Sequence, residues 1–171
     1  MNNNLKAGVL GAGHLGKIHL RLLNQSEKYD LIGFYDESQT VRENITKEFG
    51  FTAFASVAEL IDAVDVVDIV TPTLFHHELA KQAIEKGKHI FVEKPITQTV
   101  AQAEELILLA EKQGVLGQVG HVERFNPAFL AVKEHISESM FIETHRLAEF
   151  NPRGTDAVSY THLRAHETAM Y

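Results

Sequence analysis

The chain has 171 residues, of which 44% are hydrophobic, and this length supports one well-packed domain plus a smaller remnant. The formal net charge of -7 provides no electrostatic attraction to nucleic acid or to an anionic membrane, so we expect neither as a partner. The absence of cysteine excludes disulfides and thiolate metal sites, and the N-terminal residues lack the pattern of a signal peptide, from which we expect a cytoplasmic protein with no membrane span.

Short β-branched runs alternate along the chain with amphipathic stretches of helical period. This alternation predicts an α/β fold, a doubly wound parallel sheet covered on both faces by crossover helices. We expect six strands, over residues 5–10, 30–35, 52–54, 66–70, 89–92 and 116–119.

Two of the predicted helices have apolar side chains at the spacing that places them on one face. We expect these side chains to face the sheet. They are Leu15, Ile18 and Leu22 in the first helix, and Val100, Ala103, Ile107 and Ala110 in the long helix after Pro95.

A glycine-rich turn directly follows the first predicted strand. Gly11, Gly13 and Gly16 form the pattern G-x-G-x-x-G between the strand KAGVL and the helix HLGKIHLRLL. In this context the first glycine permits a tight turn, the second lets the backbone approach a pyrophosphate, and the third allows the helix to pack closely on the strand. The start of the helix, with His14 and Leu15, offers free amides and a positive dipole end to phosphates. The turn therefore predicts a Rossmann dinucleotide-binding domain.

Asp36 ends the second predicted strand, 20 residues after Gly16. A carboxylate at this point can accept both ribose hydroxyls of adenosine and repels a 2′-phosphate. The next residues are Glu37 and Ser38 rather than arginine, which favours NAD over NADP. The alternative role of Asp36 is to cap the following helix. We interpret His19, in the first helix, as a partly buried packing residue, because no carboxylate stands at metal-ligand spacing from it, and we expect no metal site.

In a doubly wound sheet, ligands bind at the carboxyl ends of the strands. The residues at these positions are Thr71, Pro72 and His76 after the strand at 66–70, and Glu93, Lys94 and Pro95 after the strand at 89–92. Pro95 favours an extended backbone at Lys94, and a cis Lys94–Pro95 bond would fix where the ammonium group points. A lysine aimed into the cleft can bind a substrate hydroxyl and assist proton transfer, although a lysine at a strand end is most often only solvated.

Three segments together resemble the N-terminal half of the glucose-fructose oxidoreductase, inositol dehydrogenase and MocA (Gfo/Idh/MocA) family: VLGAGHLGKIH, VTPTLFHHELAKQAIEKGKHIFVEKPIT and GHVERFNPAF. The resemblance extends over residues 5–156, and the Glu-Lys-Pro step is its most specific mark. It implies that Lys94 lies beside the nicotinamide, where it contacts the cofactor, orients the substrate and assists proton transfer, with Glu93 in the same cofactor site. It also implies that Thr71, Pro72 and His76 line the nicotinamide side.

The family resemblance implies a function as well as a fold. Members transfer a hydride between NAD(P) and a secondary alcohol of a sugar or nucleotide sugar, and we expect a homo-oligomeric parent enzyme. Residues 120–127 resemble members that act on nucleotide-linked amino sugars, which makes Arg124 and Asn126 candidate substrate contacts. The alternative for Arg124 is an ion pair near a helix start.

The C-terminal part of the sequence is expected to differ from the rest. Asn126 and Pro127 predict a helix that starts at Pro127 and runs to about His135. We divide the chain into an NAD-binding domain at 1–125, a connecting helix with the first strand of a truncated second α+β domain at 126–157, and a tail at 158–171. The tail, VSYTHLRAHET and the residues after it, resembles a translated sequencing adapter, so we give His162 and His166 no chemical role.

Family members have a second domain that forms the other wall of the cofactor cleft. A cleft with one wall does not exclude water, so we expect weak or no catalysis by this chain. Two other functions are compatible with the glycine-rich turn. One is a non-catalytic dinucleotide-binding or regulatory module. The other is a methyltransferase, which has no use for the Glu-Lys-Pro step.

Overall fold

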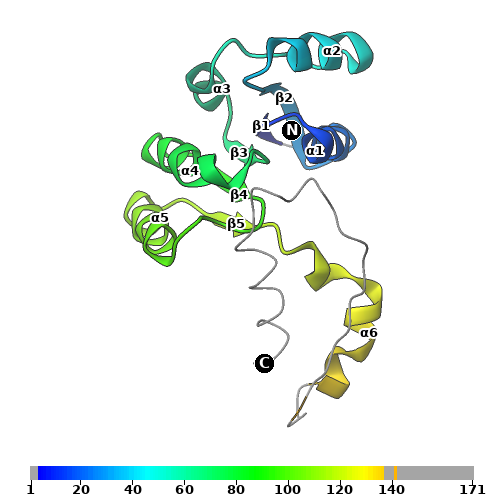
Figure 1. The fold of residues 1–171 in the computed structure, drawn as a ribbon, viewed down its shortest axis with the longest axis vertical. Helices are drawn as coiled ribbons and strands as arrows, with labels where there is room; N and C mark the ends of the chain where they lie inside the picture. The colour runs from blue at the N-terminus through cyan, green and yellow to red at the C-terminus, as the bar shows by residue number, and fades with distance from the viewer. Residues whose placement is uncertain (1–3, 137–140, 142–171) are drawn as a thin grey trace. The chain divides into compact units, whose positions relative to one another are not determined.

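A computed structural model describes residues 4–136 and 141. The chain forms two compact units, Met1–His121 and Val122–Tyr171. The elements of the first unit, shown in Figure 1, are β1 (Leu5–Leu10), α1 (His14–Asn24), β2 (Tyr29–Tyr35), α2 (Gln39–Phe49), α3 (Val57–Ala63), β3 (Val66–Ile69), the short 3-10 helix η1 (Thr73–Phe75), α4 (His76–Glu85), β4 (His89–Val92), α5 (Val100–Gln113) and β5 (Gly117–Val119).

The sheet of the first unit has five strands in the order β2-β1-β3-β4-β5, and all neighbouring strands are parallel. In Figure 1, α1 lies on one side of this sheet and α4 and α5 lie on the other. The predicted doubly wound α/β fold is confirmed. The order reverses between β1 and β3, and ligands of such sheets bind in the crevice at this switch point.

Two hydrophobic cores cover the two faces of the sheet, because side chains alternate between faces along each strand. Val9 of β1 packs with Leu20 of α1 and Ile45 of α2. Its neighbour Leu10 belongs to the second core, which contains buried side chains from α3, α4 and α5. Val67 and Ile69 of β3 also face this second core, so the residue between them, Asp68, faces the α1 side.

The predicted strand at 52–54 is wrong as a full strand. Ala53 forms only an isolated parallel bridge with Phe34, supported by hydrogen bonds from Phe34 N to Thr52 O (2.9 Å) and from Phe54 N to Phe34 O (2.8 Å). The segment is a short connection between α2 and α3 at the outer edge of β2. Its backbone hydrogen bonds to β2 are therefore limited to this one bridge, and the sheet has five strands rather than six.

The predicted core-facing stripe of α1 is also wrong. Leu15, Ile18 and Leu22 are exposed, the last at 61%, whereas Gly16 and Leu20 are buried and Leu23 packs against the core. An added Cβ at Gly16 would overlap the carbonyl oxygen of Gly11, so the helix must turn its glycine toward the loop. The residues at i+4 and i+7 from this glycine then face the sheet.

The stripe predicted for α5 is partly wrong. Val100 is 76% exposed and Ile107 is also exposed, whereas Leu106 is buried. Ala103 and Ala110 are half-buried. The face that packs on the sheet is therefore centred on Leu106, at i+3 from Ala103.

The second unit contains the 3-10 helix η2 (Val122–Phe125) and α6 (Pro127–Ile136). The Asn126 side-chain oxygen accepts a hydrogen bond from Ala128 N at 3.0 Å, which confirms the predicted helix start. The first strand of the second domain, predicted at residues 140–150 within the segment 126–157, lies outside the described residues except for Phe141, and so does the tail with His162 and His166. Among the residues that the structure describes, no helix is long and apolar enough to cross a membrane.

Candidate functional site

The glycine-rich turn joins β1 to α1 at the switch point of the sheet. Gly11 has φ +90, and a Cβ there would lie 2.8 Å from the carbonyl oxygen of Val70 at the end of β3. Any side chain at this position would therefore meet both backbone strain and a clash. Gly13 differs, because a Cβ there would meet no atom of the described residues within 4 Å. The space above Gly13 is open to a ligand.

The N-terminus of α1 points its amides to this open space. Gly13 is the N-cap residue and makes no side-chain capping bond, so no side chain competes for the first-turn amides at His14, Leu15 and Gly16. His14 and Leu15 are both exposed. Free amides at a helix start, together with the helix dipole, form a binding site for an anionic group such as a pyrophosphate.

Asp36 connects the turn to the end of β2. Its Oδ2 accepts a hydrogen bond from Ala12 N at 2.8 Å, inside the glycine-rich turn, and its Oδ1 accepts one from Ser38 N at 2.9 Å. The alternative role of Asp36 as helix cap is wrong, because Ser38 is the N-cap of α2 and accepts from Val41 N at 3.4 Å. The Asp36 carboxylate thus stands beside the glycine-rich turn.

Arg42 of α2 holds the loop that follows Asp36. Its guanidinium donates to the backbone oxygens of Asp36 and of Glu37 and lies 5.4 Å from the ring centre of Tyr35. The fingerprint spacing does not indicate this arginine, because Arg42 stands six residues after Asp36, in the helix rather than directly after the strand. Its guanidinium binds the main chain in this structure.

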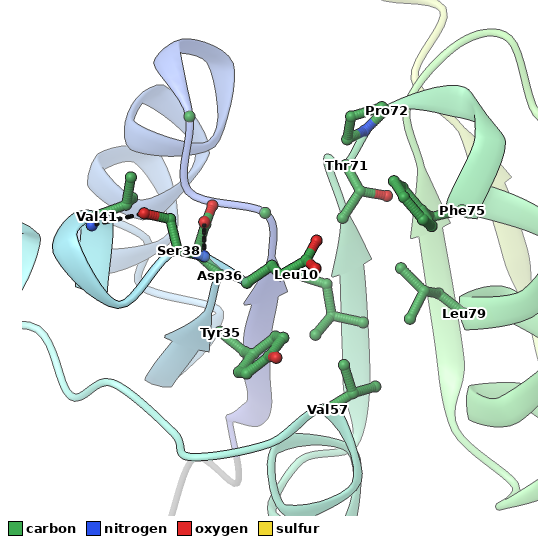
Figure 2. Close-up of a pocket in the computed structure, with 13 residues that line it drawn as sticks. Leu10, Tyr35, Asp36, Ser38, Val41, Val57, Thr71, Pro72, Phe75 and Leu79 are labelled. Atoms are coloured by element: carbon green, nitrogen blue, oxygen red, sulfur yellow. Dashed lines mark hydrogen bonds between the residues drawn. The ribbon is translucent and has the colours of Figure 1, made fainter.

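A cavity of about 800 Å³ opens between the ends of β1, β2 and β3. Figure 2 shows Asp36 and Ser38 on one side and Thr71, Pro72 and Phe75 on the other. The volume lies within the usual range of roughly 300–1,000 Å³ for small-molecule sites. Its walls combine apolar side chains with the carboxylate, which suits a flat base attached to a sugar. The apolar lining residues are Leu10, Val41, Val57, Pro72, Phe75 and Leu79.

The residues predicted after β3 fall in two different places. Thr71 and Pro72 line the cavity, and the buried Thr71 hydroxyl has no hydrogen-bond partner among the described residues. His76 is buried at the start of α4 instead, with Nδ1 2.8 Å from Pro95 O and Nε2 2.8 Å from Thr71 O. The imidazole thus connects the loop after β3 to the loop after β4.

The loop after β4 contains the Glu-Lys-Pro step. The Lys94–Pro95 peptide bond is cis, and the Lys94 side chain is exposed. Glu93 is buried, and its Oε2 accepts a hydrogen bond from Lys94 N at 3.1 Å.

His19 is partly buried, as predicted, but it has acidic partners that the sequence spacing did not reveal. Its Nδ1 lies 2.8 Å from Asp68 Oδ2, and its Nε2 lies 3.5 Å from Glu93 Oε1. Asp68 was not among the predicted site residues. The sequence does contain an indication of its role, because a charged residue inside an apolar strand such as VVDI is rarely buried without a partner.

Arg124 and Asn126 belong to the second compact unit. The side chains of both are exposed. Asn126 Nδ2 donates to Glu123 Oε2 at 2.9 Å in addition to its capping bond. Their contact with substrate stays a prediction.

The residues of the first unit fit a dinucleotide. One crevice brings together the groups that such a cofactor needs. The open space over Gly13 and the uncapped helix start lie at one part of it, and the Asp36 carboxylate and the Thr71 hydroxyl, which has no partner among the described residues, line it. A cluster of three or more His, Cys, Asp or Glu side chains able to hold a metal does not occur among the described residues.

Residues 5–121 match the family described as an oxidoreductase family with an NAD-binding Rossmann fold, Gfo/Idh/MocA. Among curated proteins, UDP-N-acetylglucosamine 3-dehydrogenase of Acidithiobacillus ferrooxidans is 33% identical over 169 residues, covering 96% of this chain and 52% of that protein. Its solved structure superposes with a TM-score of 0.83 at 34% identity, covering 90% of this chain and 51% of the other. GenD2 from gentamicin A biosynthesis, solved in complex with NAD, has a TM-score of 0.74 at 27% identity, covering 79% of this chain and 39% of the other. The chain thus spans about half, or less, of the length of these relatives.

Proposed function

We propose, from the premise that the chain belongs to the Gfo/Idh/MocA oxidoreductase family, that it holds NAD(H) for hydride transfer to or from a secondary alcohol of a sugar or nucleotide sugar. The observation that supports this most directly is the position of Asp36. Its carboxylate is bonded to the phosphate-binding turn and lines an apolar cavity at the switch point of the sheet. A sugar-type substrate is supported by the similarity to UDP-N-acetylglucosamine 3-dehydrogenase, which covers 96% of this chain.

The site would hold the two halves of the cofactor by different groups. The pyrophosphate would rest on the amides of the α1 N-terminus above Gly13, and the adenosine ribose would bond to Asp36. The apolar wall around Val41 and Val57 would cover the adenine. A carboxylate at the ribose position opposes a 2′-phosphate, so we propose NAD in preference to NADP. When bound, the nicotinamide supplies a hydride acceptor or donor.

Lys94 is the residue that we propose for proton handling. It follows β4 at the same sheet edge as the cofactor crevice, and the hydrogen bond from its backbone amide to Glu93 holds its main chain. The Lys94 side chain would bind and orient the substrate hydroxyl. As the neutral amine it would accept the hydroxyl proton during oxidation, and as the ammonium it would return that proton during reduction. Thr71 and Pro72 would line the nicotinamide side, with His76 supporting the two loops from behind.

The cofactor assignment is tested by titrating the chain with NADH and NADPH and following the cofactor fluorescence. We expect NADH to bind more tightly than NADPH. Asp36→Asn should weaken NADH binding about tenfold, which corresponds to about 1.4 kcal/mol, because the substitution removes the negative charge and one hydrogen-bond acceptor. NADPH binding should weaken less or improve. Asp30→Asn is a matched control, since Asp30 is exposed on β2 outside the cavity. If the native chain binds neither cofactor, or if Asp36→Asn binds NADH normally, the assignment is wrong.

The role of Lys94 is tested by Lys94→Ala in the complete gene product. We expect turnover with sugar alcohols to fall by about 100-fold or more, because the proton acceptor is lost, while the Kd for NADH stays within about twofold. NADH formation and NADH binding measure the two quantities separately. Retained turnover in Lys94→Ala would overturn the role of Lys94, whereas absence of turnover in the native protein would favour the alternative of a non-catalytic dinucleotide-binding module.

A further inference from the structure

A buried carboxylate lies in the central strand of the sheet, outside the cofactor cavity. Asp68 of β3 is 6% exposed, and its Oδ1 has no hydrogen-bond partner among the described residues. Its neighbours in the strand, Val67 and Ile69, pack into the core on the other face. A charged group in such a place is costly unless it is paired, so its partner matters for the fold and for the chemistry nearby.

The partner is His19 of α1, whose two ring nitrogens face two different carboxylates. Nδ1 lies 2.8 Å from Asp68 Oδ2 and Nε2 lies 3.5 Å from Glu93 Oε1. The ring of Phe91 packs edge-on against the imidazole, with centroids 5.8 Å apart. A neutral imidazole donates from one nitrogen only, whereas the imidazolium donates from both. The arrangement therefore favours the protonated ring.

The electrostatic surroundings of the ring agree with this geometry. Burial by itself lowers the pKa of His19, but the hydrogen bond to Asp68 and the charges of Asp68 and Glu93 outweigh it, so the pKa lies above its usual value of 6.5. Burial raises the pKa of Asp68, and the contact with His19 opposes this rise. The charged neighbours on α1 are engaged elsewhere: Lys17 lies 3.8 Å from Glu48, and Arg21 lies over the ring of Phe49.

Glu93 connects this cluster to the turn that contains Lys94. One of its oxygens faces His19, and the other accepts the hydrogen bond from Lys94 N at 3.1 Å. Gly120, after β5, leaves room for this side chain, because a Cβ there would lie 2.6 Å from Glu93 Oε1. The backbone of Glu93 is fixed as well, since its N donates to Ile69 O at 3.0 Å. Any movement of the Glu93 carboxylate therefore reaches the Lys94 amide.

We propose that His19 and Asp68 are positioning residues for Lys94, with an imidazolium bridge between two carboxylates that fixes Glu93 and thereby the Glu93–Lys94 backbone. The consequence for cofactor binding rests on the proposed function, whereas the coupling of His19 to the Lys94 amide does not. When rising pH removes the proton from His19, Glu93 loses its cationic partner. The Lys94 turn is then held by fewer contacts. Under the proposed function the main chain of this turn would border the nicotinamide, so NADH affinity falls, whereas loss of the Lys94 side chain alone leaves it nearly unchanged.

The coupling is measured without cofactor, by NMR on the 15N-labelled chain. The Lys94 amide and the His19 ring nitrogens are followed across the pH range in the native chain, His19→Gln and Asp68→Asn. We expect the Lys94 amide to titrate with the same midpoint as the His19 ring, above 6.5. His19→Gln should abolish this transition, and Asp68→Asn should move both midpoints to lower pH together. His77→Gln is the matched control, because the His77 ring also contacts a carboxylate, but that carboxylate is Glu105 of α5, at 2.9 Å, rather than Asp68 or Glu93.

A Lys94 amide that stays constant while His19 titrates would overturn the proposal, as would a transition that persists in His19→Gln. If that variant does not fold, the common shift of both midpoints in Asp68→Asn decides the question. Binding of NADH to the native chain is then compared across the same transition, and we expect about a fivefold loss of affinity at the higher pH. An unchanged affinity would overturn the functional part of the proposal. Failure to bind NADH at any pH would instead overturn the proposed function and leave the measured coupling intact.

Discussion

The three glycines of the turn have different physical tasks, although one sequence pattern contains all of them. Gly11 needs a positive φ and lies against the backbone of Val70, and Gly16 lies against the carbonyl of Gly11. These two residues hold the turn and the helix together. A Cβ at Gly13 would displace no atom of the described residues, so packing within this part of the chain does not require glycine there, and the proposed pyrophosphate contact would.

This difference predicts opposite effects of two substitutions. Gly16→Ala should lower the free energy of unfolding by about 3 kcal/mol, because its Cβ meets backbone that cannot move aside. Gly13→Val should cost about 1 kcal/mol, because valine is a poorer N-cap residue than glycine but its Cβ meets no atom of the described residues. It should weaken NADH binding at least about tenfold by filling the phosphate position. Urea unfolding and NADH titration of both variants measure the two effects. Normal NADH binding by Gly13→Val would show that no pyrophosphate rests on this residue.

At the scale of elements, the sequence predicts what local patterns determine and misses what tertiary contacts determine. The five strands start and end within one residue of the predicted bounds, because short apolar runs end at turn-forming residues such as Gly11 and Thr71. The rotation of α1 could not be read from periodicity, since apolar side chains occur on two of its faces. The contact between Gly16 and Gly11 selects the face that contains Leu20.

The candidate site shows the same division. The turn and Asp36 belong to one local strand-turn-helix-strand pattern with fixed spacing, so the sequence locates both. His19 lies in α1, Asp68 in β3 and Glu93 directly after β4, so the three residues are distant in sequence. Their meeting depends on the β1-β3-β4 order of the sheet and on the packing of α1, and no spacing rule encodes it.

At the scale of the whole molecule, the buried hydrophobic side chains of the described chain run from Ala7 to Leu106, all within the unit Met1–His121. The cavity and the His19–Asp68–Glu93 cluster lie in the same unit. We therefore expect a chain that ends at His121 to fold cooperatively, with a Tm within about 4 °C of that of the whole chain, because it retains every buried apolar side chain of the described core.

The same shortened chain should bind NADH with an unchanged Kd, since each group proposed to hold the adenosine and pyrophosphate precedes residue 80. Thermal unfolding and NADH titration of the two chains, side by side, test both expectations. A loss of stability without loss of binding would mean that residues after His121 support the sheet from outside its core. A loss of binding at unchanged Tm would mean that they complete the cofactor site, which would place part of the adenosine or pyrophosphate contacts outside the Rossmann unit.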